Sequence, residues 1–204
     1  MQRQNAMNKL IVVVGPSGVG KTTLVHALAR TGQFTTALEG HAGRPFQALA
    51  KQDAHYTFAN QMDYLLLRAE QERELRAASK PGLMDGGLDL DFHGFTRLFL
   101  RRNLLSLEEF DLCRRFYLLV RGLLPPPELI VRLEADEGTV AGRMSGRKRI
   151  NIARADDAAL FDSFLDEWLA DVPSNQILKL DAANESLEYN KSVQAILVRM
   201  NPLD

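Results

Sequence analysis

A glycine-rich segment, residues 15–22, has the composition of a nucleotide-binding loop. It reads Gly-Pro-Ser-Gly-Val-Gly-Lys-Thr and fits the pattern G-x-x-x-x-G-K-[ST] in full. Glycines let such a loop wrap a triphosphate, with backbone N–H groups turned toward the phosphate oxygens at the positive end of a helix. Lys21 would supply charge to the β- and γ-phosphates, and the Thr22 hydroxyl would be a ligand for Mg²⁺. We therefore predict ATP and Mg²⁺ as cofactors, bound by the following residues: Gly15, Ser17, Gly18, Val19, Gly20, Lys21, Thr22 and Thr23.

Asp85 is the candidate for chemistry on the acceptor side. It ends the short apolar run Leu83-Met84 and precedes Gly86-Gly87. If that run is a strand of a parallel sheet, ligands bind just beyond its carboxyl end. A carboxylate there could accept the proton of an attacking hydroxyl, or it could ligate Mg²⁺ through water. A third role is that of an aspartate that only forms the turn before glycine.

A polar pair on one helical face is the candidate for binding a base. Phe58, Gln61, Leu65 and Arg68 follow the three- and four-residue spacing of one side of a helix. A glutamine and an arginine in an apolar wall are what recognition of a nucleobase edge requires. The alternative is a surface glutamine beside a solvated arginine.

A basic stretch covers residues 143–154. Arg143 and Arg147 are spaced to face one anion, and Arg149 follows directly. Phosphoryl transfer spreads negative charge over the equatorial oxygens, and arginines on a closing lid can neutralise it. A solvated basic face is the alternative.

In this order and spacing, the motifs resemble the deoxyribonucleoside kinase family over about residues 10–169. The resemblance implies a kinase that uses ATP to phosphorylate the 5′-hydroxyl of a deoxyribonucleoside, and a homodimer formed through helices. Catalysis would fall to Asp85 as general base, with Lys21 and the lid arginines Arg143 and Arg147. The implied substrate contacts are Glu39 at the sugar, Phe58, Gln61 and Arg68 at the base, Asp91 behind the base site, Phe95 stacked on the base, and Arg149 in the lid.

The sequence departs from that family at two places. Gly86-Gly87 stands where the family has Arg-Ser, so the arginine that helps to hold the transferred phosphoryl group is missing. Ile150-Asn151-Ile152 stands where the family has a glutamate after the lid arginines. Both roles are therefore vacant or are supplied by other residues.

The elements that must position these residues alternate between strand-like and helix-like segments, which is typical of an α/β layered sheet. The apolar run Leu10–Val14 has the composition of a strand buried on both faces. We predict one P-loop kinase domain over residues 1–204: a three-layer sandwich with a parallel five-stranded sheet, flanking helices and an arginine-rich lid at about 143–154. The predicted strands are 10–14, 35–38, 83–85, 129–133 and 177–180, and the predicted helices are 22–30, 56–78, 91–103, 106–124, 139–144, 157–170 and 187–200.

Composition narrows the class of protein further. With 46% hydrophobic and 25% charged residues among 204, the chain is globular rather than disordered or fibrous. Its single cysteine allows no internal disulfide and no cysteine-based metal site. A net charge of −1 argues against binding to nucleic-acid polymers or anionic membranes. No apolar run approaches the roughly 20 residues that span a bilayer, so we expect a cytoplasmic protein with a small-molecule substrate.

Two rival functions stay open. A nucleoside-monophosphate kinase of the thymidylate kinase kind would share the loop, the strand order and the lid, but it needs fixed cations for the acceptor phosphate. A nucleotide-binding regulator without catalysis would fit Gly86 and the missing lid glutamate. No particular base is predicted, because the volume of the pocket depends on packing.

Overall fold

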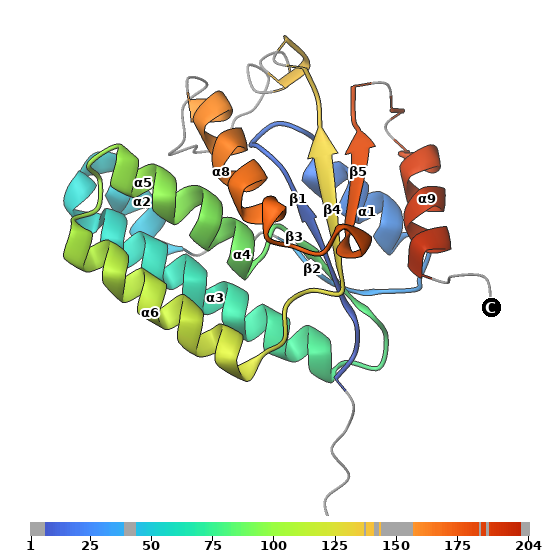
Figure 1. Ribbon diagram of the computed structural model, residues 1–204, viewed down its shortest axis with the longest axis horizontal. Coiled ribbons are helices and arrows are strands. Elements are labelled where there is room, and N and C mark those ends of the chain that lie inside the picture. Colours follow the sequence, from blue (N-terminus) through green and yellow to red (C-terminus); the bar gives the residue numbers. More distant parts are fainter. Residues whose placement is uncertain are drawn as a thin grey trace, which may run out of the picture.

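The structure, a computed structural model, describes residues 7–38, 44–136, 138–140, 143, 157–183, 185–186 and 188–200. At its centre is a parallel sheet of five strands in the order β2-β3-β1-β4-β5 (Figure 1). The predicted α/β fold with a five-stranded parallel sheet is therefore confirmed. The strands are β1 (Leu10–Val14), β2 (Thr35–Ala37), β3 (Gly82–Asp85), β4 (Leu129–Glu134) and β5 (Ile177–Asp181).

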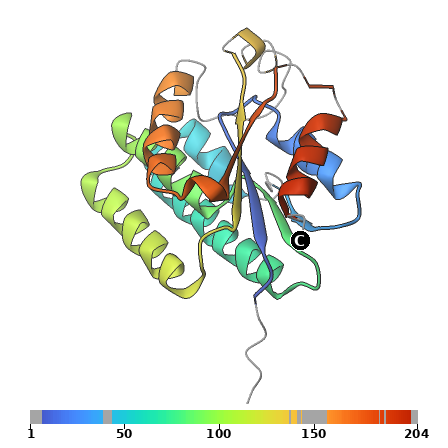
Figure 2. The same cartoon turned by 45° about the vertical axis from the view of Figure 1, so that its right-hand side comes forward.

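Helices cover both faces of the sheet (Figures 1 and 2). One face carries α1 (Lys21–Ala29) and α9 (Asn190–Met200), and six further α-helices lie on the opposite side. These are α2 (Pro45–Gln52), α3 (Thr57–Ala77), α4 (Leu88–Leu90), α5 (Arg97–Arg101), α6 (Leu107–Leu123) and α8 (Ala158–Ala170), with 3₁₀ turns η1 (Ala54–Tyr56) and η4 (Ser174–Gln176) and a π-helical turn η2 (Asp91–Thr96).

The central strand β1 explains this layering. All five of its residues are buried, and successive side chains of a strand point to opposite faces. Ile11 and Val13 belong to the core shared with α1 and α9, whereas Leu10, Val12 and Val14 belong to the core shared with α3 and α8. The strand is apolar throughout because both of its faces are covered.

The register of the sheet brings two predicted site segments together. β1 and β3 pair in parallel, with Val13 opposite Asp85. β1 ends at Val14, directly before the glycine-rich loop, and β3 ends at Asp85. The loop and the carboxylate therefore emerge side by side at the carboxyl edge of the sheet, where parallel α/β folds bind their ligands.

Helix α6 begins as the sequence Ser106-x-x-Glu109 predicts. The Ser106 hydroxyl accepts a hydrogen bond from the Glu109 backbone N–H at 3.2 Å, and the Ser106 N–H donates to the Glu109 carboxylate at 2.8 Å.

Among the described residues, no helix combines the length and the apolar composition needed to cross a membrane.

Two helical segments differ from the prediction. Helix α2 was not predicted from the sequence; it is only eight residues long, and the only residues that it buries are Gln47 and Ala50. The helix predicted over 91–103 begins earlier, at Leu88, and widens into the π-helical turn η2 before α5. This widening surrounds Asp91, one of the predicted site residues.

Candidate active site

The glycine-rich loop joins β1 to α1, as its motif predicted. Gly15 and Gly20 have φ angles of 148° and 114°, which side chains disfavour. A Cβ atom at Gly15 would also lie 2.7 Å from the Leu133 carbonyl oxygen. The Lys21 ammonium group donates to the carbonyl oxygens of Gly15 at 2.9 Å and Pro16 at 3.1 Å. The lysine therefore lies over its own loop, with its charge beside the loop backbone.

Asp85 and Thr22 join the acceptor side to the nucleotide loop. Asp85 is completely buried, and its Oδ2 accepts a hydrogen bond from the Thr22 hydroxyl at 2.6 Å. Its other oxygen, Oδ1, is buried and has no hydrogen-bond partner in the described part of the chain. A buried carboxylate oxygen without a partner is unfavourable. It is therefore a candidate to accept a hydrogen bond from a ligand.

The same pair suits Mg²⁺. The Thr22 hydroxyl gives its hydrogen to Asp85, so the lone pairs of its oxygen remain for a cation. Mg²⁺ prefers hard oxygen ligands and keeps several waters, so a few protein oxygens beside a nucleotide are enough. The oxygen donors at this edge of the sheet thus fit the predicted cation.

Gln61, Arg68 and Asp91 come together in the interior. Gln61 is 2% exposed and Arg68 is 1% exposed, so the alternative of a surface glutamine beside a solvated arginine is wrong. Arg68 Nε donates to Asp91 Oδ2 at 2.8 Å. Gln61 Nε2 lies 3.0 Å from the Asp91 carbonyl oxygen and 2.8 Å from Thr96 Oγ1. Asp91 therefore holds both polar side chains, as a residue behind a base site would.

Two aromatic residues and Gly86 flank this cluster. Phe58 is partly buried against the core between α3 and α6, and the Phe95 ring lies 4.8 Å from that of Phe161. Gly86 has a φ of 80°, and a Cβ atom there would lie 3.2 Å from Arg68 Nη2. The Arg68 guanidinium therefore lies next to the position where the family has an arginine. Base stacking by Phe95 stays a prediction.

Only the first residue of the predicted lid cluster is described. Arg143 Nη1 donates to the Val19 carbonyl oxygen at 2.8 Å, and Nη2 donates to the Ala182 carbonyl oxygen at 2.9 Å. Arg143 thus connects the glycine-rich loop to the residue after β5, and its role on the phosphoryl group stays a prediction. The predicted contacts of Glu39, Arg147 and Arg149 and the lid segment 144–154 lie outside the described residues.

Two residues at the site carry no signal in the local sequence pattern. Tyr189 is 3% exposed, and a Cβ atom at Gly20 would overlap its hydroxyl. Burial raises the pKa of Tyr189, so its hydroxyl stays protonated beside the loop. Thr96 bonds to Gln61 from the end of the π-helical turn. Both contacts depend on tertiary packing, and neither spacing nor residue type reveals them.

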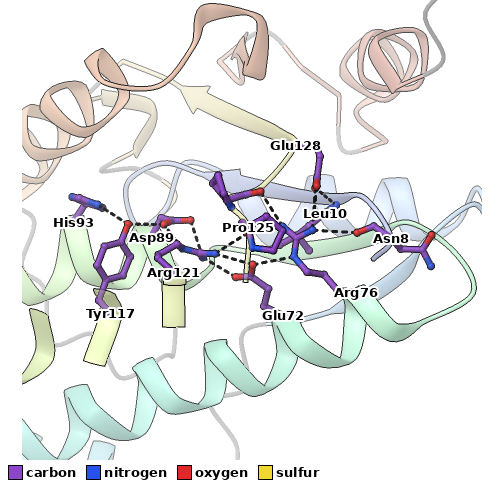
Figure 3. Close-up of polar contacts among 11 residues, drawn as sticks. Asn8, Leu10, Glu72, Arg76, Asp89, His93, Tyr117, Arg121, Pro125 and Glu128 are labelled. Carbon is purple, nitrogen blue, oxygen red and sulfur yellow. Dashed lines mark hydrogen bonds and ion pairs between the residues drawn. The ribbon is translucent and has the colours of Figure 1, made fainter. Parts of the chain in front are cut away.

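A buried network of charges lies beside the site (Figure 3). Arg121 Nε donates to Asp89 Oδ1 at 2.9 Å, and its Nη2 donates to Glu72 Oε2 at 2.7 Å. Arg76 donates to the buried Glu72 and, at the exposed end of the network, to Glu128, each at 3.2 Å. Removing one partner of a buried ion pair leaves a charge unpaired, at a cost of about 3–5 kcal/mol. The network therefore fixes α4, which follows the Asp85 turn, against α3 and α6.

His93 lies at one end of this network (Figure 3). Its ring stacks on that of Trp168, with centroids 5.3 Å apart and planes 5° from parallel. The Tyr117 hydroxyl donates to Asp89 at 2.9 Å, so its oxygen accepts a hydrogen bond from His93 Nε2–H at 3.1 Å. Burial, and then the charges of nearby arginines, lower the pKa of His93 from 6.5 to about 4.

The free energy of unfolding should therefore fall as the pH drops below 6.5. His93 takes up a proton near pH 6.5 in the unfolded chain but only near pH 4 in the folded protein. Its contribution to the free energy of unfolding is therefore complete above pH 6.5 and is lost as the pH falls toward 4. At about 1.4 kcal/mol per pKa unit, His93 accounts for at most about 3 kcal/mol of this loss. Urea unfolding at pH 7 and at pH 5 measures the change in the free energy of unfolding. Between these pH values, the free energy of unfolding of His93→Gln should fall by about 2 kcal/mol less than that of the parent. Equal falls in the parent and the variant would contradict the prediction.

Comparison with known protein families gives one match over nearly the whole chain. The family described as "Deoxynucleoside kinase" matches residues 11–201. A curated relative, the deoxyadenosine/deoxycytidine kinase of Bacillus subtilis (strain 168), is 24% identical over 145 residues. The aligned region covers 70% of this chain and 67% of the relative.

Solved structures share the fold. The deoxyadenosine kinase from M. mycoides with the products dCMP and a flexible dCDP bound has a TM-score of 0.79 at 17% identity, covering 95% of this chain and 100% of that one. The same enzyme with bound dATP has a TM-score of 0.75 at 18% identity, covering 94% and 99%. The element order and the sheet described above therefore recur in these structures.

Proposed function

This chain belongs to the deoxynucleoside kinase family and is a phosphotransferase, and from this premise we propose that it transfers the γ-phosphoryl group of ATP to the 5′-hydroxyl of a deoxyribonucleoside. One observation carries the proposal for this site: the hydrogen bond between Thr22 and Asp85. It joins the glycine-rich loop to a buried carboxylate whose second oxygen has no partner among the described residues. A nucleotide on the loop and a hydroxyl on Asp85 would thus be neighbours.

Each residue of this edge has a distinct task in the proposal. The loop N–H groups and Lys21 bind the phosphates, and the Thr22 hydroxyl holds Mg²⁺, oriented by its hydrogen bond to Asp85. When bound there, Mg²⁺ would supply positive charge beside the phosphate oxygens, on which negative charge develops. Asp85 Oδ1 accepts the proton of the 5′-hydroxyl as its oxygen attacks. Because Asp85 Oδ2 is occupied by Thr22, one carboxylate serves both the cation site and the acceptor.

On the acceptor side, we assign the base to Phe58, Gln61, Arg68 and Phe95, with Asp91 holding Arg68 in place. A nucleoside carries no phosphate, so base contacts must supply most of its recognition. The burial of the Arg68–Asp91 pair supports this assignment, because a paired arginine is a directed donor rather than a phosphate clamp.

The names of the relatives, which specify deoxyadenosine and deoxycytidine, support a nucleoside acceptor over a monophosphate. Glu39 at the sugar, and Arg143, Arg147 and Arg149 on the transferred phosphoryl group, remain part of the proposal.

We also propose a homodimer that acts in the cytoplasm, in nucleotide salvage. Leu112, Leu119 and Leu123 of α6 are 45%, 63% and 69% exposed, and their spacing puts them on one face of the helix. A second copy of the chain would cover that apolar face. The lone cysteine, Cys113, is buried and unpaired, which suits a reducing compartment.

The test of the proposed function offers each deoxyribonucleoside and its 5′-monophosphate, side by side, to the full chain with ATP and Mg²⁺. We expect the nucleosides to be phosphorylated. Turnover of monophosphates alone would instead identify a nucleoside-monophosphate kinase, and activity toward neither would favour a nucleotide-binding regulator.

In the same assay, Gln61→Ala should lower kcat/KM for the nucleoside roughly 5- to 150-fold, because a buried polar group left without its partner costs about 1–3 kcal/mol. Gln194→Ala is the matched control, since Gln194 is exposed on α9, across the sheet from Gln61. A Gln61 variant with the kcat/KM of the parent would remove Gln61 from the base site.

A further inference from the structure

The carbonyl group of Val19 sets the direction of the next N–H group in the glycine-rich loop. In a trans peptide the C=O and N–H groups point to opposite sides, so the Val19 oxygen and the Gly20 hydrogen face away from each other. Arg143 Nη1 donates to the Val19 oxygen at 2.8 Å. Gly20 directly precedes α1, and the first N–H groups of a helix have no partner within it. The Gly20 N–H therefore points away from Arg143 and remains for a phosphate oxygen.

Arg143 is itself attached to the end of the sheet. Its other terminal nitrogen, Nη2, donates to the Ala182 carbonyl oxygen at 2.9 Å. The Ala182 N–H in turn donates to the Glu134 carbonyl oxygen at 2.8 Å, directly beyond the last paired residues of β4 and β5. The Arg143 guanidinium group thus connects the glycine-rich loop to a fixed point at the carboxyl edge of the sheet.

The Tyr189 hydroxyl lies between the loop and this arginine. A Cβ atom at Gly20 would overlap the hydroxyl, and the same atom would lie 3.6 Å from Arg143 Nη1. Burial raises the pKa of the hydroxyl, and the nearby charge of Arg143 opposes that rise. The Tyr189 side chain belongs to the same buried core as Val19 and Ile196. The ring therefore holds the hydroxyl in place beside Gly20 and Arg143.

The backbone of Tyr189 gives a second, independent sign that its side chain is needed. Tyr189 has a φ of 52°, a conformation that glycine adopts readily and other residues rarely. Its N–H donates to the Ser186 carbonyl oxygen at 3.1 Å, and its carbonyl oxygen accepts from the Val193 N–H at 2.8 Å. Backbone strain of this kind is concentrated at functional sites.

We propose that Tyr189 is a positioning residue for the donor nucleotide: it holds Arg143 on the Val19 carbonyl group and thereby keeps the Gly20 N–H directed at the phosphates of ATP. Arg143 then has a task in the loop besides the one proposed for it on the transferred phosphoryl group. The inference rests on the proposed function in taking ATP as the donor, but it does not depend on the acceptor.

Tyr189→Phe tests the proposal, because it removes the hydroxyl and keeps the ring in the core. Titration of the full chain with ATP and Mg²⁺, without a nucleoside, should give a Kd roughly 2- to 12-fold above that of the parent, since one hydrogen bond to a phosphate oxygen is weakened. With a nucleoside that is phosphorylated, the KM for ATP should rise by a similar factor. The KM for the nucleoside and kcat at saturating ATP should stay those of the parent.

The outcomes separate this inference from the proposed function. An unchanged Kd for ATP in Tyr189→Phe would overturn the inference and leave the proposed function standing. A raised Kd together with no turnover of any nucleoside by the parent would support the inference and overturn the proposed acceptor. Absence of ATP binding by the parent would overturn both.

Substitution of Arg143 tests whether Tyr189 acts through it. Arg143→Lys keeps the charge but lacks the planar fork that reaches two carbonyl groups, so the Kd for ATP should rise in this variant too. Adding Tyr189→Phe to Arg143→Lys should raise the Kd little further, because changes to one shared interaction are not additive. Effects that multiply in full would assign Tyr189 a packing role only. If the Tyr189 variant does not fold, an unchanged Kd in Arg143→Lys still overturns the inference.

Tyr117→Phe is the matched control. It removes the hydroxyl of another tyrosine, which is partly buried on α6, on the opposite side of the sheet from α9, and donates to Asp89 at 2.9 Å. The Kd for ATP should equal that of the parent, although thermal unfolding should occur at a lower temperature. A rise in Kd equal to that of Tyr189→Phe would show a general effect of lost stability and would overturn the inference.

Discussion

Replacing Asp85 with asparagine should lower kcat by roughly 10²- to 10⁴-fold, the usual range for a lost general base. Asparagine keeps the shape of the side chain and can still accept from the Thr22 hydroxyl, whose bond to Asp85 is 2.6 Å long. What is lost is the basicity of Oδ1, the buried oxygen without a partner in the described chain. The affinity for the nucleotide should change little. Steady-state kinetics with a deoxyribonucleoside, together with nucleotide titration of the purified variant, measure both effects.

The same variant separates the two roles left open for Asp85. If it is the general base, kcat of Asp85→Asn should fall while the Mg²⁺ concentration for half-maximal activity stays that of the parent. If it acts through the cation, the Mg²⁺ concentration for half-maximal activity should rise instead. Asp111→Asn is the matched control, because the Asp111 side chain is half-exposed on α6 and pairs with Arg114. A kcat equal to the parent's would assign Asp85 to the turn alone.

Replacing Lys21 with alanine should abolish turnover, with a loss of roughly 10³-fold or more, because a charge on the transferring phosphoryl group is removed. The fold should stay intact, since the ammonium group contacts the carbonyl groups of Gly15 and Pro16 rather than the core. Kinetics and thermal unfolding of the same preparation measure the two effects separately.

Lys9→Ala is the control for that variant, because Lys9 is exposed at the opposite end of β1 from the loop. It should have the activity of the parent. Phosphorylation by the Lys21 variant at the parent rate would show that the glycine-rich loop is not the phosphate site.

The parts of the molecule that follow from local pattern were predictable. The five apolar residues of β1 indicate a strand covered on both faces, and the structure has it so. The spacing of Gln61 and Arg68 put them on one helical face, and both lie buried on α3. Period and spacing carry this information because they depend only on the geometry of a helix or a strand.

What could not be predicted depends on contacts between distant segments. The π-helical turn forms where the Asp91 carbonyl group meets Gln61 from another helix and where Gly94 meets Phe161. Likewise, nothing around Tyr189 in the sequence indicates that its hydroxyl packs on Gly20. Such contacts produce no periodic pattern of residue types in the sequence, so the sequence alone does not reveal them.

The position of Tyr189 has a consequence for the order in which the protein matures on the ribosome. The glycine-rich loop is synthesised before its partners in the chain, because it is supported by Tyr189 and, through Arg143, by Ala182. Translation proceeds at roughly 5–20 residues per second, so the loop waits on the order of ten seconds for these partners. A nascent chain that ends before β5 therefore lacks a finished phosphate site, and bound ATP can stabilise only chains that extend beyond Tyr189.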